Sequence, residues 1–183
     1  MLYRSIYFFI VLFGTSSHAI AQASLFEKTY FGMGVSYGGE NIDPTPGGNK
    51  YRVGSGAILE TGASWGLFDS NTLSSRTSIA YRYQRSKTSK GANTGIVLES
   101  ALVHSGYFLD LGAGFRADLL NEVVDAAGNK TEFKNSLGGL FFAQWSLYSN
   151  MDVILKYTVT DYESQNGTIY SGEQYGIYLS IWN

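Results

Sequence analysis

Hydrophobic and polar residues alternate along most of the chain after its first two dozen residues. The clearest case runs from Leu109 to Leu119, where every second residue is apolar and the residues between are Gly, Asp or Arg. Alternation with a period of two predicts β-strands that have one apolar and one polar face. The pattern predicts eight strands, at about residues 29–38, 51–67, 74–85, 94–103, 109–119, 133–147, 152–160 and 174–181.

The connections between these strands alternate in length. Tight turns are expected at residues 69–71, 104–106 and 149–150, and longer polar segments at residues 39–50, 86–93, 121–132 and 163–171. Short turns at one end and long loops at the other are typical of outer-membrane barrels, whose long loops lie outside the cell. We therefore expect an all-β fold, an eight-stranded antiparallel up-and-down transmembrane β-barrel.

The sizes of the side chains indicate which face points outward. The apolar face carries Tyr, Trp, Phe, Leu and Ile, and the other face is mainly Gly, Ser and Thr with isolated charges. An eight-stranded barrel is only wide enough inside to be filled by side chains, so small residues belong inside. Charged residues make up 15% of the chain, whereas a soluble exterior usually carries about a quarter to a third. The apolar face is expected to meet lipid; a soluble periplasmic barrel is the alternative.

The first 23 residues are expected to be a signal peptide. Arg4 precedes an apolar run at residues 6–13, and two small-x-small cleavage sites end at Ala21 and Ala23. The run is shorter than the roughly 20 residues of a spanning helix. Residues 24–183 would then form the barrel. The chain has no cysteine and a net charge of −2, which gives no indication of a nucleic-acid partner.

Aromatic residues near the strand ends predict two belts at the level of the lipid headgroups. The belt at the short-turn end would contain Trp65, Tyr107, Trp145 and Tyr148, and the belt at the long-loop end Tyr37, Tyr51, Tyr83, Phe133 and Tyr162.

The strand pattern, the alternating loops and the final strand QYGIYLSIW at residues 174–182 resemble the small outer-membrane barrels related to the OmpA transmembrane domain and OmpX. The resemblance is architectural and extends over residues 24–183. It implies a bacterial outer-membrane protein. We expect outer-membrane lipid and lipopolysaccharide as partners, and an envelope protein is a further candidate. Members of this class usually end on an aromatic residue, whereas this chain ends in Trp182 and Asn183, with Trp182 on the inward parity.

Charged residues of both signs fall on the predicted inward face and are expected to pair with one another. Buried charges must be matched and hydrogen-bonded, so we expect a paired polar network that plugs the barrel. A conducting or gating network is the alternative. Glu60, Arg82 and Glu99, on three consecutive predicted strands, are expected to form one cluster within this network. The full set is Arg52, Glu60, Arg76, Arg82, Glu99, Asp110, Arg116, Asp118, Lys134, Asp152 and Lys156.

A minority of inward positions is apolar. Such residues are expected to fill an end of the core or to mark a β-bulge; a pocket for an acyl chain or another small hydrophobic molecule is the alternative. They are Ile58, Val97, Val103, Leu140, Phe142, Ile154 and Tyr178.

No catalytic, cofactor or metal site is expected. His104, the sole histidine after the signal peptide, lies beside Ser105 in a predicted periplasmic turn, away from the outer leaflet in which lipid A lies. A pair of carboxylates such as Glu99 and Asp110 remains an alternative for acid–base catalysis. Arg85, with Lys87 and Lys90 in the same loop, offers charged donors for lipopolysaccharide phosphates, although a solvated hairpin is favoured.

These observations predict a non-enzymatic outer-membrane barrel with a structural, adhesive or accessory role, exerted through its surface loops or a protein partner. A barrel that binds or passes a small hydrophobic molecule is the first alternative, and a lipid A-modifying enzyme is the second. Fold alone does not choose among these functions.

Overall fold

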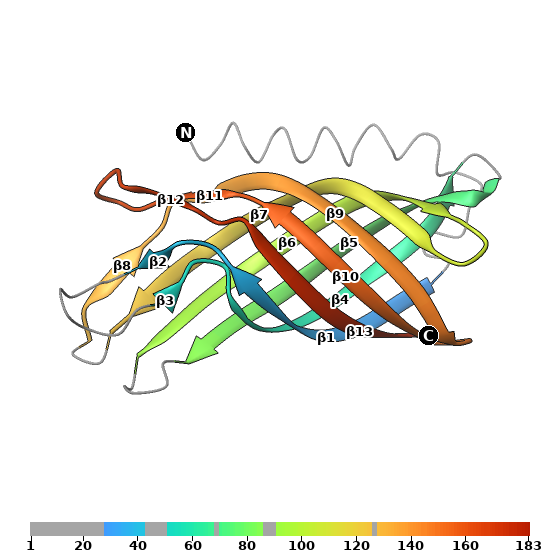
Figure 1. Cartoon of the computed structure of the whole chain (residues 1–183), viewed down its shortest axis with the longest axis horizontal. Helices are drawn as coiled ribbons and strands as arrows, with labels where there is room; N and C mark the ends of the chain where they lie inside the picture. Colours follow the sequence, from blue (N-terminus) through green and yellow to red (C-terminus); the bar gives the residue numbers. More distant parts are fainter. Residues whose placement is uncertain (1–27, 43–50, 68–69, 86–90, 126–127) are drawn as a thin grey trace.

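The long strands of the chain form a closed antiparallel barrel (Figure 1). The computed structural model describes residues 28–42, 51–67, 70–85, 91–125 and 128–183. Strands that follow one another in sequence pair around the barrel, and β1 pairs with β13 to close it, which confirms the predicted fold class. The strands of the wall are β1 (Lys28–Gly38), β4 (Gly56–Leu67), β5 (Ser70–Arg85), β6 (Ala92–Ser105), β7 (Asp110–Val124), β9 (Ser136–Tyr148), β10 (Met151–Val159) and β13 (Gln174–Trp182).

The described part of the chain contains no helix that is both long and apolar enough to cross a membrane. The predicted signal peptide, residues 1–23, and the loop residues Lys87 and Lys90 lie outside the described residues.

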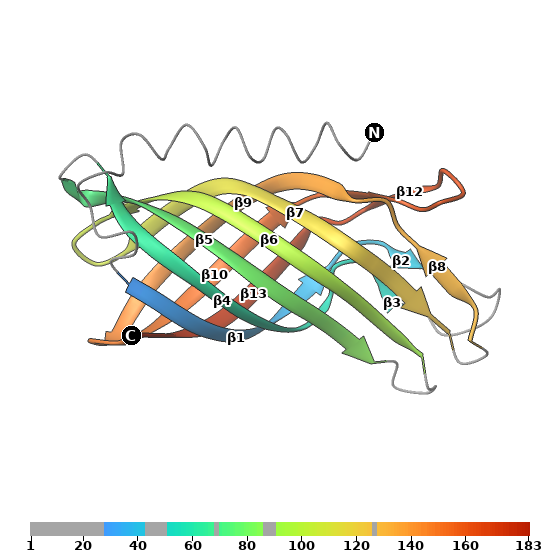
Figure 2. The ribbon, with the colours of Figure 1, turned by 180° about the vertical axis from the view of Figure 1, so that it is seen from behind.

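Short strands extend the wall at the end where the long connections lie (Figures 1 and 2). Backbone hydrogen bonds from Lys134 to Glu163 and from Glu40 to Ser171 connect neighbouring segments of this extension. The segments predicted as long loops are therefore partly ordered. The short strands are β2 (Asn41–Ile42), β3 (Tyr51–Arg52), β8 (Lys130–Glu132), β11 (Asp161–Glu163) and β12 (Ile169–Ser171).

The predicted second strand, residues 51–67, is interrupted between β3 and β4. Val53, Gly54 and Ser55 are buried there, so the chain turns into the mouth of the barrel before it joins the wall at Gly56. Gly54 has a φ of 82°, a left-handed conformation that glycine adopts without steric strain. The hydroxyl of Ser36 donates to the carbonyl oxygen of Gly54 at 2.7 Å and holds this inward segment in place.

Large apolar side chains point outward and polar side chains point inward, as the alternation predicts. On β7, Phe115 is 67% exposed, whereas the next residue, Arg116, is 1% exposed. Inward glycines make room for the few large side chains inside. A Cβ atom on Gly112 would lie 2.2 Å from the ring of Phe142, so that ring packs directly against the wall.

A β-bulge changes the parity of β7 near the loop end. The register with β6 shifts between Thr94 and Ile96, and Leu120, opposite this irregularity, has a positive φ of 51°. Before the bulge the even-numbered residue Asp118 is buried; after it the odd-numbered residue Asn121 is buried. The bulge therefore turns Asn121 inward, toward the polar interior.

Candidate functional site: the closed interior and the loop end

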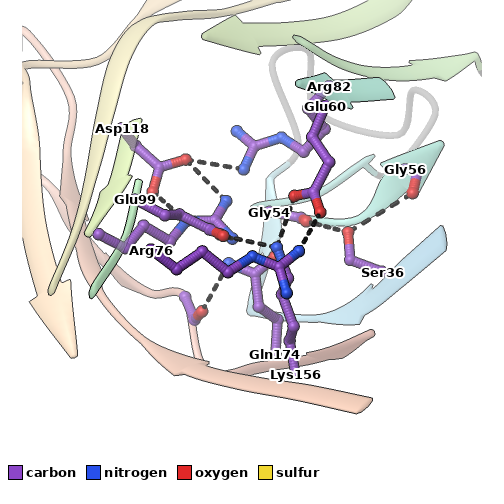
Figure 3. A network of polar contacts seen from close by, with 12 residues as sticks. Ser36, Gly54, Gly56, Glu60, Arg76, Arg82, Glu99, Asp118, Lys156 and Gln174 are labelled. Carbon is purple, nitrogen blue, oxygen red and sulfur yellow. Dashed lines mark hydrogen bonds and ion pairs between the residues drawn. The ribbon is translucent and has the colours of Figure 1, made fainter. Parts of the chain in front are cut away.

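A buried lysine lies at the centre of the polar interior (Figure 3). The Nζ atom of Lys156 donates to Glu60 Oε2 at 2.5 Å and to Glu99 Oε2 at 2.6 Å. The second oxygen of Glu60 lies 3.4 Å from a guanidinium nitrogen of Arg76, and that of Glu99 lies 3.7 Å from one of Arg116. Each of these carboxylates therefore lies between two cations.

A second carboxylate site lies nearer the loop end. Arg116 binds Asp118 through two hydrogen bonds of 2.6 and 3.0 Å, and Arg82 donates to the same carboxylate at 2.9 Å. Arg82 also donates to Asn121 Oδ1 at 2.5 Å and to the Tyr162 hydroxyl at 3.1 Å. Burial raises the pKa of Tyr162, so its hydroxyl stays protonated at neutral pH.

The network continues to the short-turn end. Arg76 donates to Gln144 Oε1 at 2.6 Å, and Gln144 Nε2 donates to Asp152 at 2.8 Å. The indole nitrogen of Trp182 donates to the same carboxylate of Asp152. The Arg76 guanidinium lies 4.0 Å from the centre of the Tyr30 ring. Trp182 thus has the inward parity expected from the sequence and helps to close this end.

The charges of the interior balance. The buried cations are Arg76, Arg82, Arg116 and Lys156, and the buried carboxylates are Glu60, Glu99, Asp118 and Asp152, which gives a net charge of zero. A cavity of about 10 Å³ borders this network, roughly the space that one water molecule needs. The described interior is therefore filled by side chains.

Some members of the predicted network lie elsewhere. Arg52 lies in β3 at the loop end, where it donates to the carbonyl oxygen of Gly39 at 3.3 Å. Lys134 is exposed and pairs with Glu163 at 2.5 Å. Asp110 is half-buried at the short-turn end of β7. Period-two alternation does not reveal that the chain at Arg52 and Lys134 has left the barrel wall.

The structure also changes the composition of the first predicted cluster. Glu60 and Glu99 are joined through Lys156, whereas Arg82 binds Asp118 instead. The interior partners that the sequence reasoning missed are uncharged: Tyr30, Asn121, Gln144, Tyr162, Gln174 and Trp182. Inward parity was the available signal for Gln144, Gln174 and Trp182.

The inward apolar residues fill the barrel. All seven of the apolar positions identified in the sequence belong to one buried cluster, together with Ala80 and Ala101. Because these side chains pack against one another, the structure supports the core-filling interpretation over an internal pocket. They are Ile58, Val97, Val103, Leu140, Phe142, Ile154 and Tyr178.

A second apolar cluster lies beneath the short strands of the loop end. Its members are Ile42, Tyr51, Val53, Val123, Phe133 and Tyr162. This differs from the predicted belt, because Tyr51, Phe133 and Tyr162 are almost completely buried. They lie in or beside the short strands, where the chain packs over the mouth. Of the other predicted belt residues, Tyr37, Tyr83, Tyr107, Trp145 and Tyr148 are exposed, and Trp65 is half-buried.

The two carboxylates considered for acid–base catalysis are not brought together, because Glu99 lies opposite Arg116 whereas Asp110 lies opposite Ser105 at the short-turn end of β6 and β7. His104 is exposed on β6, while the next residue, Ser105, pairs with Asp110; successive side chains of a strand point to opposite faces. Glu99 is occupied by Lys156 and Arg116. No group of three or more potential metal ligands occurs among the described residues.

The fold and the closed polar interior define a class of protein: the chain has the architecture of the small eight-stranded outer-membrane β-barrels. Solved structures similar to it include Neisserial surface protein A (14% identity, TM-score 0.55, 87% of this chain and 97% of that chain). Another is Ail, the attachment invasion locus protein of Yersinia pestis (10% identity, TM-score 0.51, 85% of this chain and 98% of that chain). No protein-family model and no curated protein matches the sequence.

Proposed function

We propose that the protein is an integral barrel of the bacterial outer membrane that has no catalytic activity. In this proposal it acts as an adhesive, structural or accessory component through its loop end or a protein partner. The main support is its outer surface, where residues such as Phe31, Leu111 and Phe115 are about half or more exposed. An apolar surface of this extent would be unstable in water and is suited to hydrocarbon.

The neutral, filled interior supports a role that does not involve transport. A path for ions or solutes would require breaking the contacts of Lys156 and Arg116 with their carboxylates. In planar lipid bilayers we therefore expect no stable conductance from the purified protein. A reproducible open state would favour the channel alternative instead.

The ordered loop end supports a role at the cell surface. Its short strands are joined by backbone hydrogen bonds and cover an apolar core, so their outer faces form a fixed surface. A preformed surface loses less conformational entropy on binding than a flexible loop does. The two similar structures named above are a surface protein and an attachment invasion locus protein, and this favours the adhesive form of the proposal.

Cysteine labelling tests the proposed orientation, since the natural chain has no cysteine. Ile169→Cys places a thiol on β12 at the loop end, and Ser149→Cys places one in the turn between β9 and β10. A membrane-impermeant maleimide added to intact cells should label the first variant and not the second. Labelling of Ser149→Cys alone would reverse the orientation, and equal labelling after osmotic release would indicate a soluble protein.

The adhesive role needs a separate measurement. Replacing residues 164–168 by a short Gly-Ser turn removes the tip of the β11–β12 hairpin while keeping both strands. Binding of expressing cells to host-cell or matrix surfaces should fall, with surface expression unchanged. Unchanged binding would exclude this hairpin as the adhesive element and leave a structural or accessory role.

A further inference from the structure

The pairing of β4 with β5 ends at the loop end, beside the start of β4. The last pair between β4 and β5 at this end is Ala57 with Tyr83, because the preceding residues of the chain turn into the barrel mouth. The side-chain amide of Asn93 donates to the Arg52 carbonyl oxygen at 3.1 Å and lies 3.5 Å from Gln84 Oε1. These contacts place β3 next to the end of β5.

Two arginines lie near this end of the β4–β5 pairing. Arg52, in β3, is half-exposed, and its guanidinium lies 4.8 Å from the centre of the Tyr37 ring. Arg85, the last residue of β5, is exposed. Within the described part of the chain neither arginine forms an ion pair, and Arg85 forms no hydrogen bond.

The other cations at the loop end differ from this pair. Lys130 is paired with Glu122, and Lys134 with Glu163. The guanidinium groups of Arg52 and Arg85 therefore provide the uncompensated positive charge among the described residues of this end. A planar guanidinium can bind two phosphate oxygens at once, which makes arginine well suited to phosphate recognition.

The exposed tyrosine rings on the neighbouring strands indicate the depth of the two arginines in the membrane. Tyr37 and Tyr83 point outward from β1 and β5, near the loop ends of these strands. Tyrosines with this placement have their rings in the apolar region and their hydroxyls among the headgroups. The two guanidinium groups consequently lie at the level of the lipid headgroups.

We infer that Arg52 and Arg85 form a binding site for the phosphate groups of an outer-leaflet glycolipid, with Tyr37 and Tyr83 packing beside its headgroup. This inference rests on the proposed location in the outer membrane. The sugar-phosphate headgroup of lipid A is the ligand to which the inference commits, because it carries two phosphates and lies in the outer leaflet. The site would fix the barrel to its surrounding lipid and does not depend on the interior network.

The test compares two double variants that each remove two positive charges from the loop end. Arg52→Gln/Arg85→Gln removes the site, and Lys130→Gln/Lys134→Gln is the matched control. Purified protein in mild detergent is titrated with bisphosphorylated lipid A, and bound lipid is counted by native mass spectrometry. Each arginine near an anionic lipid surface contributes roughly a factor of five, so the site variant should bind about thirtyfold more weakly. The control should stay within about twofold of the natural protein.

Two other phosphate-containing ligands show whether the site recognises lipid A or attracts any anion. Phosphatidylglycerol and inorganic phosphate should bind weakly and lose little affinity in the arginine variant. Equal losses for lipid A and phosphatidylglycerol would overturn the glycolipid assignment. Equal losses in the two double variants, or no loss in either, would overturn the site itself.

The proposed function is checked on the same preparations. Heat-modifiable migration on gels and insertion into lipid vesicles report on the barrel and not on the arginines. If both are preserved while lipid A binding is unchanged, the site is wrong and the proposed function stands. If the natural protein itself does not insert, the proposed function fails.

Discussion

Replacing Lys156 by methionine tests whether the interior is a dry, matched network. The substitution keeps an unbranched apolar side chain in place of the lysine methylenes and removes the ammonium group that donates to Glu60 at 2.5 Å and to Glu99 at 2.6 Å. Arg76 and Arg116 remain as partners of these carboxylates, at 3.4 and 3.7 Å. The interior then carries one uncompensated negative charge.

The expected effect follows from the burial of these groups. Removing one partner of a buried ion pair destabilises a protein by about 3–5 kcal/mol, because the other charge stays buried without its match. Glu60→Gln alone should destabilise the barrel for the same reason, since it leaves the interior with an excess positive charge. Lys156→Met combined with Glu60→Gln restores neutrality. The double variant should therefore lose less than the sum of the two single variants, with a coupling free energy of about 2 kcal/mol.

The assay is equilibrium unfolding in urea of protein folded into lipid vesicles, followed by tryptophan fluorescence and by heat-modifiable migration. Lys134→Met is the matched control, since it removes an exposed ion pair and should change the unfolding free energy by less than about 1 kcal/mol. A loss below 1 kcal/mol for Lys156→Met, with additive effects in the double variant, would show that water solvates the interior charges. That result would refute the closed-barrel reasoning.

Three further tests probe other parts of the wall by the same unfolding assay. Gly112→Ala places a methyl group against the Phe142 ring and should lower the unfolding free energy by about 1–3 kcal/mol. Phe142→Leu in the same chain should restore part of this loss. Additive losses of the two substitutions would contradict the contact. Leu120→Val puts a β-branched residue at a φ of 51° and should lower the unfolding free energy by about 1–2 kcal/mol. Leu120→Gly should leave it nearly unchanged. Equal effects of the two substitutions would argue against the bulge. Trp182→Phe removes a hydrogen bond to the Asp152 carboxylate and should lower the unfolding free energy by about 1.5–3 kcal/mol. An unchanged unfolding free energy would place that indole outside the network.

The fold could be predicted because alternation and loop length are local properties of the sequence. The sizes of the side chains correctly predict which face of each strand points outward, as Phe115 and Arg116 show. The loop end could not be predicted in this way. Their positions near the strand ends predict that Tyr51 and Tyr162 belong to a lipid-facing belt, whereas the chain turns over the mouth there and buries both rings.

The partners inside the barrel could not be assigned from parity, because inward side chains from every strand converge on one axis. Lys156 binds Glu60 and Glu99, which lie 96 and 57 residues away in the sequence. The inward glycines restrict the choice. A Cβ atom on Gly34 would lie 2.5 Å from the ring of Tyr178, so the glycine leaves the room in which that ring packs against β1. The ring in turn lies 4.4 Å from the Lys156 ammonium. The position of a glycine on one strand thus helps to decide where a lysine two strands away can place its charge, and this makes the inward glycines as informative as the inward charges.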